Sequence, residues 1–321
     1  MVPKIVVVGS ANTDFVLSVH QLPAKGETIL GNQFTVARGG KGANQAVAAA
    51  RLGADVTFVA RLGTDSLGRE SIGAYIQEGI RTDYIVQDPE IHSGVALIMV
   101  NQQGDNIIGV GPGANGRLAV ADVQAAEEAI RGADCLLVQL EIPLEAVRAA
   151  LEIAHRHHVR SILNPAPAQT LPPEMLKLVD TLTPNETEAA ILAGQDPSAA
   201  GQDSLPRLAS ILDVPNLIVT LGARGACILQ NVEPTYIRSF PITPVDTTAS
   251  GDAFNGALAV SLASGNSLSQ AVRYACAAGA VTATRPGAQP SLPTREELDQ
   301  FIASSAPGPN PAVRDAVDQP S

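Results

Sequence analysis

The sequence has little of what several protein classes require. Its 321 residues include no tryptophan, aromatic residues make up 3%, and the three cysteines (Cys135, Cys227 and Cys276) lie far apart. An odd number of widely spaced cysteines fits neither a disulfide framework nor a zinc cluster, so we expect reduced thiols. No apolar run reaches membrane-spanning length, and the N-terminus enters a strand pattern without a signal-type apolar region. We therefore expect a cytoplasmic protein with no membrane partner.

Basic residues are also scarce. Lysine and arginine number 21 against 32 aspartates and glutamates, which gives a formal net charge of -11. Because affinity for a phosphate backbone comes largely from lysine and arginine, we expect no nucleic-acid partner. Hydrophobic residues make up 45% of the chain, enough for a large core. We assign residues 1–305 to one α/β domain and expect a disordered tail at 306–321, which is proline-rich and has little apolar content.

Strand and helix patterns alternate along most of the chain. The β-branched run Ile5 to Val8 ends at Gly9, as a strand buried in a parallel sheet does. Repeated strand-helix units follow from Val56, which predicts a mostly parallel sheet flanked by helices, with ligands at the carboxyl ends of its strands. The segments at about 12–36 and 94–110 instead predict antiparallel strands. We expect these strands to form a small lid on the main sheet.

A run of small residues precedes a predicted helix late in the chain. It reads Asp246-Thr-Thr-Ala-Ser-Gly-Asp-Ala-Phe-Asn255, and an apolar-periodic stretch continues from Ala253 to Ala263. A helix N-terminus has unpaired N–H groups and the positive end of the helix dipole, so it suits a phosphoryl group. Asp252 in the same turn can accept a proton from an attacking hydroxyl. The alternative is that Asp252 only complements the helix dipole.

Three glycines occur in a second motif, Gly39-Gly-Lys-Gly-Ala-Asn44, ahead of a helix predicted over Gln45 to Leu52. The glycines permit close approach of a ligand, while Lys41 and Asn44 can hold hydroxyl groups. A tight turn before a packed helix explains the motif equally well. The motif is not a phosphate-binding loop of the Walker type, because no serine or threonine follows Lys41.

Three shorter motifs leave alternatives open. Asn185 and Glu188 can orient water around a phosphate-bound Mg²⁺, or can cap a helix. The glycine-rich turn 220–225 either lies along nucleotide phosphates or closes a hairpin. The run 111–116 matches G-x-G-x-x-G, but Pro112 lies inside it and no acidic residue ends the next strand. We therefore discard it as a dinucleotide site.

Taken together, these motifs resemble the ribokinase/phosphofructokinase-B family of sugar kinases. Residues 39–44 resemble the first signature of that family, 246–255 the second, and Asn185 to Glu188 its N-x-x-E element. The resemblance covers about residues 4 to 304 in family order. Segments 9–14, 39–46, 164–167 and 287–291 resemble ribokinases in particular. The implied fold is ribokinase-like: a central, mostly parallel sheet flanked by helices, with an antiparallel β lid.

The resemblance also implies a role for individual residues. The sugar would contact Asn12, Asp14, Gly40, Lys41, Gly42, Ala43, Asn44, Glu141 and Asp252. The turn Ala249, Ser250, Gly251 and Asp252 would form the anion hole, with Asp252 as the general base. ATP would contact Asn185, Thr220, Leu221, Gly222, Ala223, Arg224, Gly225, Gly251, Asp252 and Cys276. Potassium would be bound by Asp246, Thr248, Thr282, Arg285, Gly287 and Ser291, and Mg²⁺, through water, by Asn185 and Glu188.

The activity that follows is ATP-dependent phosphorylation of D-ribose at O5, giving D-ribose 5-phosphate, with Mg²⁺ and K⁺ as cofactors. One alternative is a kinase for another sugar or a nucleoside. A non-catalytic sugar-binding regulator is an alternative from a different class. Because a half-polar lid sheet needs covering, we also expect a homodimer formed through the lid.

Overall fold

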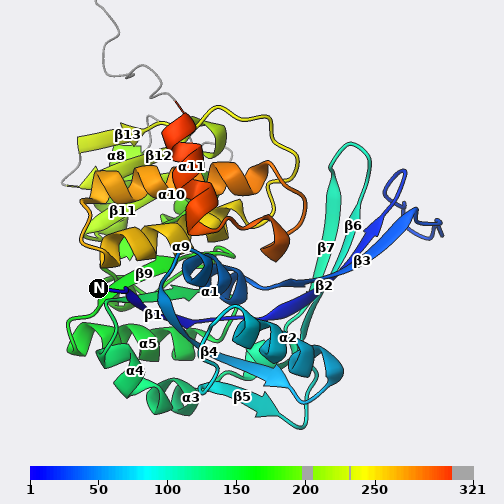
Figure 1. The fold of residues 1–321 in the computed structure, drawn as a ribbon, viewed down its shortest axis with the longest axis horizontal. Helices are drawn as coiled ribbons and strands as arrows, with labels where there is room; N and C mark the ends of the chain where they lie inside the picture. The colour runs from blue at the N-terminus through cyan, green and yellow to red at the C-terminus, as the bar shows by residue number, and fades with distance from the viewer. Residues whose placement is uncertain (197–204, 231–232, 306–321) are drawn as a thin grey trace, which may run out of the picture.

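The computed structural model describes residues 1–196, 205–230 and 233–305, which form a nine-stranded sheet and a separate four-stranded sheet (Figure 1). The predicted tail at 306–321 lies outside the described residues. Within those residues, no helix has the length and apolar character needed to cross a bilayer.

The main sheet has the order β13-β12-β11-β10-β9-β8-β1-β4-β5. Neighbours from β5 to β11 pair in parallel, while β11 with β12 and β12 with β13 are antiparallel. All five residues of β8 are buried, as the apolar runs predicted. The strands are β1 (Lys4–Val8), β4 (Asp55–Gly63), β5 (Ile85–Asp88), β8 (Cys135–Gln139), β9 (Arg160–Asn164), β10 (Thr181–Leu182), β11 (Asn216–Thr220), β12 (Ala226–Gln230) and β13 (Glu233–Ile237).

Helices cover both faces of this sheet, so it has two hydrophobic cores. One core includes α1, α9 and α10, whose small residues allow close packing, and the other includes α3, α5 and α8. The helices are α1 (Lys41–Arg51), α2 (Ser66–Gln77), α3 (Val120–Ala125), α4 (Glu127–Arg131), α5 (Leu144–Arg156), α6 (Pro173–Leu176), α7 (Glu186–Leu192), α8 (Leu205–Leu212), α9 (Ser250–Ala263), α10 (Leu268–Ala283) and α11 (Arg295–Ser304), with 3₁₀ turns η1 (Gly113–Arg117), η4 (Gly222–Arg224) and η5 (Gln289–Ser291).

The second sheet corresponds to the predicted lid. It contains β2 (Asn12–Ser18), β3 (Gln33–Gly39), β6 (Gly94–Val100) and β7 (Asn106–Gly111) in the order β3-β2-β6-β7, and extends away from the main body (Figure 1). The pairs β2–β3 and β6–β7 are antiparallel, as predicted, whereas β2 and β6 pair in parallel. Paired residues share a face of a sheet and successive residues alternate. Asp14, opposite Ala37 and Ala96, therefore lies on one face, and Phe15, opposite Val36 and Leu97, on the other.

Two helices begin earlier than their patterns predicted. Helix α1 starts at Lys41 rather than Gln45, because Gly40 takes a positive φ of 87° and turns the chain directly into the helix. Helix α9 starts at Ser250 rather than Ala253, after Ala249 in the left-handed conformation. Lys41 and Asn44 are therefore in the first turn of a helix, and so is Asp252.

Candidate active site

Asp252, in the first turn of α9, is held by two amides from α1. Asn44 Nδ2 donates to its Oδ2 and Gln45 Nε2 to its Oδ1, each over 2.9 Å. Asp252 is 6% exposed. Both oxygens of the buried carboxylate thus have a hydrogen-bond donor. These two bonds hold the Asp252 side chain in one orientation at the junction of α1 and α9.

The amide network continues to the ends of two central strands. Gln139 Nε2 donates to Gln45 Oε1 over 2.6 Å, and Gln45 Nε2 also donates to Asn164 Oδ1 over 3.0 Å. Sequence reasoning gave no role to Gln45 or Gln139. The sequence did contain a signal: Gln45 is an amide within an alanine-rich helix, and Gln139 is an amide in a buried strand. A buried polar group needs hydrogen-bond partners, so both positions indicated a polar network.

Charged groups surround Asp252. Burial raises the pKa of Asp252 above its ordinary value, against the opposing effect of Lys41 and its two amide donors. Burial alone lowers the pKa of Lys41, but Asp252, Glu141 and Glu188 raise it overall, so the ammonium stays protonated. Ser10 Oγ and the Lys41 backbone N–H both donate to Glu141 Oε2, over 2.6 and 3.0 Å.

Asp14 faces this cluster from the lid. Burial, followed by the charges of Glu141 and Asp252, raises the pKa of Asp14 to about 6. A side chain at the neighbouring Gly39 would place its Cβ 2.1 Å from Asp14 Oδ2, so the adjacent strand leaves room for this carboxylate only as glycine. Asp14, Lys41, Glu141 and Asp252 are therefore electrostatically coupled across the lid and the main sheet.

The remaining predicted sugar residues divide into two groups. Asn12 is buried at the start of β2, and Gly40 caps α1 directly above Ala11 and Asn12. Gly42 and Ala43 lie beneath the site: a Cβ on Gly42 would come within 2.5 Å of Ser10 N, and the Ala43 N–H donates to Ser10 O over 2.8 Å. These two residues hold α1 against the end of β1.

A cavity of about 370 Å³ opens on the other side of the α9 N-terminus. Six of the residues predicted to contact ATP line it: Thr220, Gly222, Ala223, Gly225, Gly251 and Cys276. Its apolar wall was not predicted from the sequence and includes Phe240, Ile242, Phe254 and Ala280. Phe240, Ile242 and Ala280 come from segments that carry no motif, and Phe254 lies in the 246–255 motif, where no role was assigned to it.

The other predicted ATP residues lie around this cavity rather than among its lining residues. Leu221 is buried, and its N–H donates to Gly225 O over 2.8 Å, which closes the β11–β12 hairpin. Arg224 pairs with Glu186 over 2.6 Å. Segment 220–225 therefore closes a hairpin and also contributes to the cavity wall, so its two sequence interpretations are compatible.

The α9 N-terminus presents backbone donors between the cavity and Asp252. The Ser250 N–H donates to Thr247 O over 3.2 Å, whereas the N–H groups of Gly251 and Asp252 have no acceptor in the described part of the chain. Ala249 reverses the chain direction at φ 61°. A phosphoryl group approaching from the cavity would meet these N–H groups and the positive end of the helix dipole.

Three of the predicted cation residues, Asp246, Thr248 and Gly287, are joined by hydrogen bonds ahead of this turn. Asp246 accepts the N–H groups of Thr248 and Gly287, over 2.9 and 2.8 Å. Burial opposes ionisation, but these hydrogen bonds lower the pKa of Asp246. Thr282 Oγ1 is buried and has no partner among the described residues. Arg285 pairs through its side chain with Glu297, and Ser291 Oγ donates to Ala288 O.

Asn185 and Glu188 form a capping box at α7. Asn185 Oδ1 accepts the Glu188 N–H over 2.8 Å, and Glu188 Oε2 accepts the Asn185 N–H over 2.9 Å. Burial raises the pKa of Glu188, and Lys41 and Asp252 also act on it, so this carboxylate faces the catalytic cluster. The motif thus caps helix α7, as one of its two sequence interpretations predicted.

Known carbohydrate kinases are similar to this chain over most of its length. A model described as "pfkB family carbohydrate kinase" matches residues 2–295. The chain is 43% identical over 299 residues to the ribokinase of Haemophilus influenzae (92% of this chain, 97% of the relative) and 34% identical over 302 residues to a deoxyribokinase of Salmonella typhi (93% and 98%). The structure of Arabidopsis thaliana ribokinase complexed with ribose and ATP is similar, with a TM-score of 0.85, 32% identity and coverage of 94% and 99%. The chain belongs to the pfkB family of carbohydrate kinases.

Proposed function

We propose that this chain transfers the γ-phosphoryl group of ATP to O5 of D-ribose, giving D-ribose 5-phosphate and ADP. The observation that carries the proposal is Asp252, a buried carboxylate held by Asn44 and Gln45 beside α9 N-terminal N–H groups that have no acceptor among the described residues. A base next to an anion hole is the arrangement that phosphoryl transfer to a hydroxyl requires. The ribokinase relatives support ribose as the acceptor.

The sugar would bind between the lid and the end of the main sheet. Ionised Asp14 and Glu141 accept hydrogen bonds from hydroxyl groups, and Asn12, Asn44 and Lys41 donate to them. The acceptor hydroxyl then lies against Asp252. Because water in this space would compete for the phosphoryl group, the lid serves to exclude it.

The reaction is an in-line displacement. The O5–phosphorus bond forms while the bond from phosphorus to the ADP oxygen breaks, and Asp252 accepts the O5 proton. The N–H groups of Gly251 and Asp252 and the Lys41 ammonium stabilise the charge that spreads over the transferring group. The adenosine portion would occupy the cavity lined by Phe240, Ile242 and Cys276.

The residues present fit two metal ions. Magnesium bound to the phosphates would be approached through water by Asn185 and Glu188, and it would neutralise phosphate charge. Potassium would suit the loop of Asp246 and Gly287. The Asp246 N–H donates to Ala283 O, next to Thr282, whose buried hydroxyl lacks a partner among the described residues. Potassium there would add positive potential behind the anion hole. Equal activity in K⁺ and in a bulky organic cation, at constant ionic strength and Mg²⁺, would reject the potassium site.

The acceptor is tested by a substrate panel. We expect kcat/KM to be higher for ribose than for 2-deoxyribose, fructose or adenosine, because a site built to pair with a hydroxyl rejects an analogue that lacks it. A preference for 2-deoxyribose would indicate the activity of the deoxyribokinase relative. Turnover of no acceptor, with ribose still bound, would favour a sugar-binding regulator.

We further infer that the protein acts in the cytoplasm, where ATP is supplied and the three unpaired cysteines stay reduced. We also infer a homodimer joined through the lid. On the lid face that carries Phe15, Phe34 and Leu97 are 60% and 62% exposed, and such an apolar patch marks an interface. Leu97→Asp should convert a dimer into a monomer by light scattering. Ile211→Asp is the control, because it places the same charge on an exposed apolar residue outside the lid, on helix α8. A parent protein that is already monomeric rejects the dimer.

A further inference from the structure

The discarded glycine motif at 111–116 has a structural place beside the sugar site. Its residues 113–116 lie in η1, which contacts β6 and, through Asn115, the first residue of β2. Gly113 has φ 50°, and a side chain there would come within 2.4 Å of His92 O. The Ala114 N–H donates to His92 O over 2.9 Å. These close contacts bring Asn115 between the two strands.

The backbone determines which way the Asn115 amide faces. Its Oδ1 accepts the Ala11 N–H over 2.9 Å, and its Nδ2 donates to Ala11 O over 3.1 Å. A backbone N–H can only donate and a carbonyl can only accept, so the reverse orientation would lose both bonds. Asn115 is 2% exposed, and an unpaired amide at that depth is costly.

This orientation is passed on to Asn12. Asn115 Nδ2 also donates to Asn12 Oδ1 over 2.7 Å. Asn12 must therefore present its oxygen to Asn115, and its Nδ2 is turned the other way, where it has no acceptor within the described residues. The amide nitrogen is thus a committed donor two residues before the Asp14 carboxylate, on the same face of β2.

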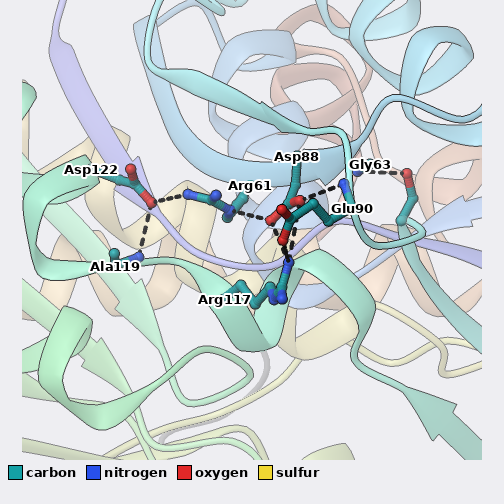
Figure 2. Close-up of polar contacts among 8 residues, drawn as sticks. Arg61, Gly63, Asp88, Glu90, Arg117, Ala119 and Asp122 are labelled. Atoms are coloured by element: carbon teal, nitrogen blue, oxygen red, sulfur yellow. Dashed lines mark hydrogen bonds and ion pairs between the residues drawn. The ribbon is translucent and has the colours of Figure 1, made fainter.

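Two further features hold this arrangement. A Cβ on Gly94 would lie 2.1 Å from Asn115 Nδ2 and 2.2 Å from Asn12 Oδ1, so the bond passes directly over a glycine. Figure 2 shows Arg61 and Arg117 converging on Asp88, which anchors the end of η1. Arg61 also pairs with Asp122 over 2.9 Å. The η1 segment is consequently fixed on both sides of Asn115.

We propose that Asn115 is a positioning residue that sets the specificity of the sugar site by making Asn12 a hydrogen-bond donor. The proposal rests on the proposed sugar kinase function. A donor at Asn12 beside an acceptor at Asp14 selects a sugar whose neighbouring hydroxyl groups accept one hydrogen bond and donate another. With Asn12 reversed, its oxygen would face the sugar and could not donate to a hydroxyl, and a hydroxyl that gives its single proton to Asp14 would leave the Asn12 oxygen without a donor.

Asn115→Asp tests this in a double-mutant cycle with Asn12→Ala. Aspartate has nearly the same shape but cannot donate to Asn12 Oδ1, so it favours the reversed Asn12 amide. We expect the dissociation constant of the sugar that the parent binds best to rise roughly ten- to a hundredfold, with KM for ATP unchanged. In the Asn12→Ala background the same substitution should change the constant less than about twofold.

Two variants serve as comparison. Gly94→Ala places a methyl group from strand β6 between Asn115 Nδ2 and Asn12 Oδ1 and so breaks their hydrogen bond. It should reproduce the loss of sugar affinity if Asn115→Asp does not fold. Ser93→Ala removes bonds to Asp65 and Gly63 at the start of β6 without touching Asn12, and should leave sugar affinity unchanged. An equal loss in both cycle backgrounds, or no loss in Asn115→Asp or Gly94→Ala, overturns the positioning role. Sugar binding by the parent protein is measured first. A parent that binds no sugar overturns the proposed function as well as the positioning role.

Discussion

The two halves of the candidate active site are built in opposite ways. The sugar half consists of buried charged and amide side chains that join distant parts of the chain, such as Asn44 and Asp252, 208 residues apart. The nucleotide half is a cavity with an apolar wall and backbone N–H groups at the α9 N-terminus. Side-chain chemistry should therefore control the sugar half, whereas side-chain size should control the nucleotide half.

Asp252 lies where the halves meet, and its replacement should have the largest effect. In Asp252→Asn, Asn44 can turn its amide, because its own Oδ1 is buried without a partner among the described residues, while Gln45 keeps its bond. The site stays intact but loses its base. Turnover should fall by about 10² to 10⁴ fold with ribose affinity largely kept. Steady-state kinetics with calorimetry measures both, and near-normal turnover would remove Asp252 as the base.

Gly251→Ala should affect only the nucleotide half. A Cβ at Gly251 meets nothing within 4 Å, so the methyl group would enter open space on the wall of the ATP cavity. We expect kcat/KM for ATP to fall roughly ten- to a hundredfold, while alanine stabilises the helix by up to about 1 kcal/mol.

Gly73→Ala is the matched control, since it is also in a helix with no neighbour near the added Cβ. It should give a similar gain in stability with unchanged kinetics. A Gly251→Ala enzyme with unchanged kcat/KM for ATP would place the phosphates elsewhere.

Lowering the pH should weaken the sugar half. The pKa of Asp14 is raised to about 6, so its ionised fraction falls from about nine-tenths at pH 7 to about one-tenth at pH 5. Because the proposed role of Asp14 requires the ionised carboxylate to accept hydrogen bonds from the sugar, ribose affinity should decrease roughly tenfold over this range. Asp14→Asn should bind ribose weakly and with no such pH dependence. A parent profile that is flat from pH 7 to 5 would contradict the role of Asp14.

The last effect concerns stability. A raised pKa in the folded state means that Asp14 favours folding below its ordinary pKa of 3.8 and opposes it as the pH rises through about 6. Asp14→Asn should therefore increase the free energy of unfolding at pH 7 by about 1 to 3 kcal/mol, and by much less at pH 4.

Chemical denaturation at the two pH values measures this difference. Asp299→Asn, at an exposed position on α11, removes the same charge as a control and should change little. A less stable Asp14→Asn protein at pH 7 would show that the carboxylate is satisfied within the apo fold.

The sequence was sufficient for the fold and for the positions of the main motifs. Apolar runs such as Ile5 to Val8 predicted the buried parallel strands, and the segments near 12–36 and 94–110 predicted the lid. Small residues before Asp252 predicted a helix N-terminus, which the structure confirms at Ser250. These features depend on local periodicity and turn chemistry, which can be recognised from residues that are close together in the sequence.

Tertiary structure alone decided how these parts meet. Gln45, Gln139 and Asn115 acquire their roles from partners far along the chain, because a buried amide must find a donor or an acceptor wherever the fold supplies one. The apolar wall of the cavity likewise includes Phe240 and Ile242, whose local sequence resembles that of any core residue. The sequence by itself thus determined the elements and the chemistry of the motifs, and packing determined the directions in which their side chains point.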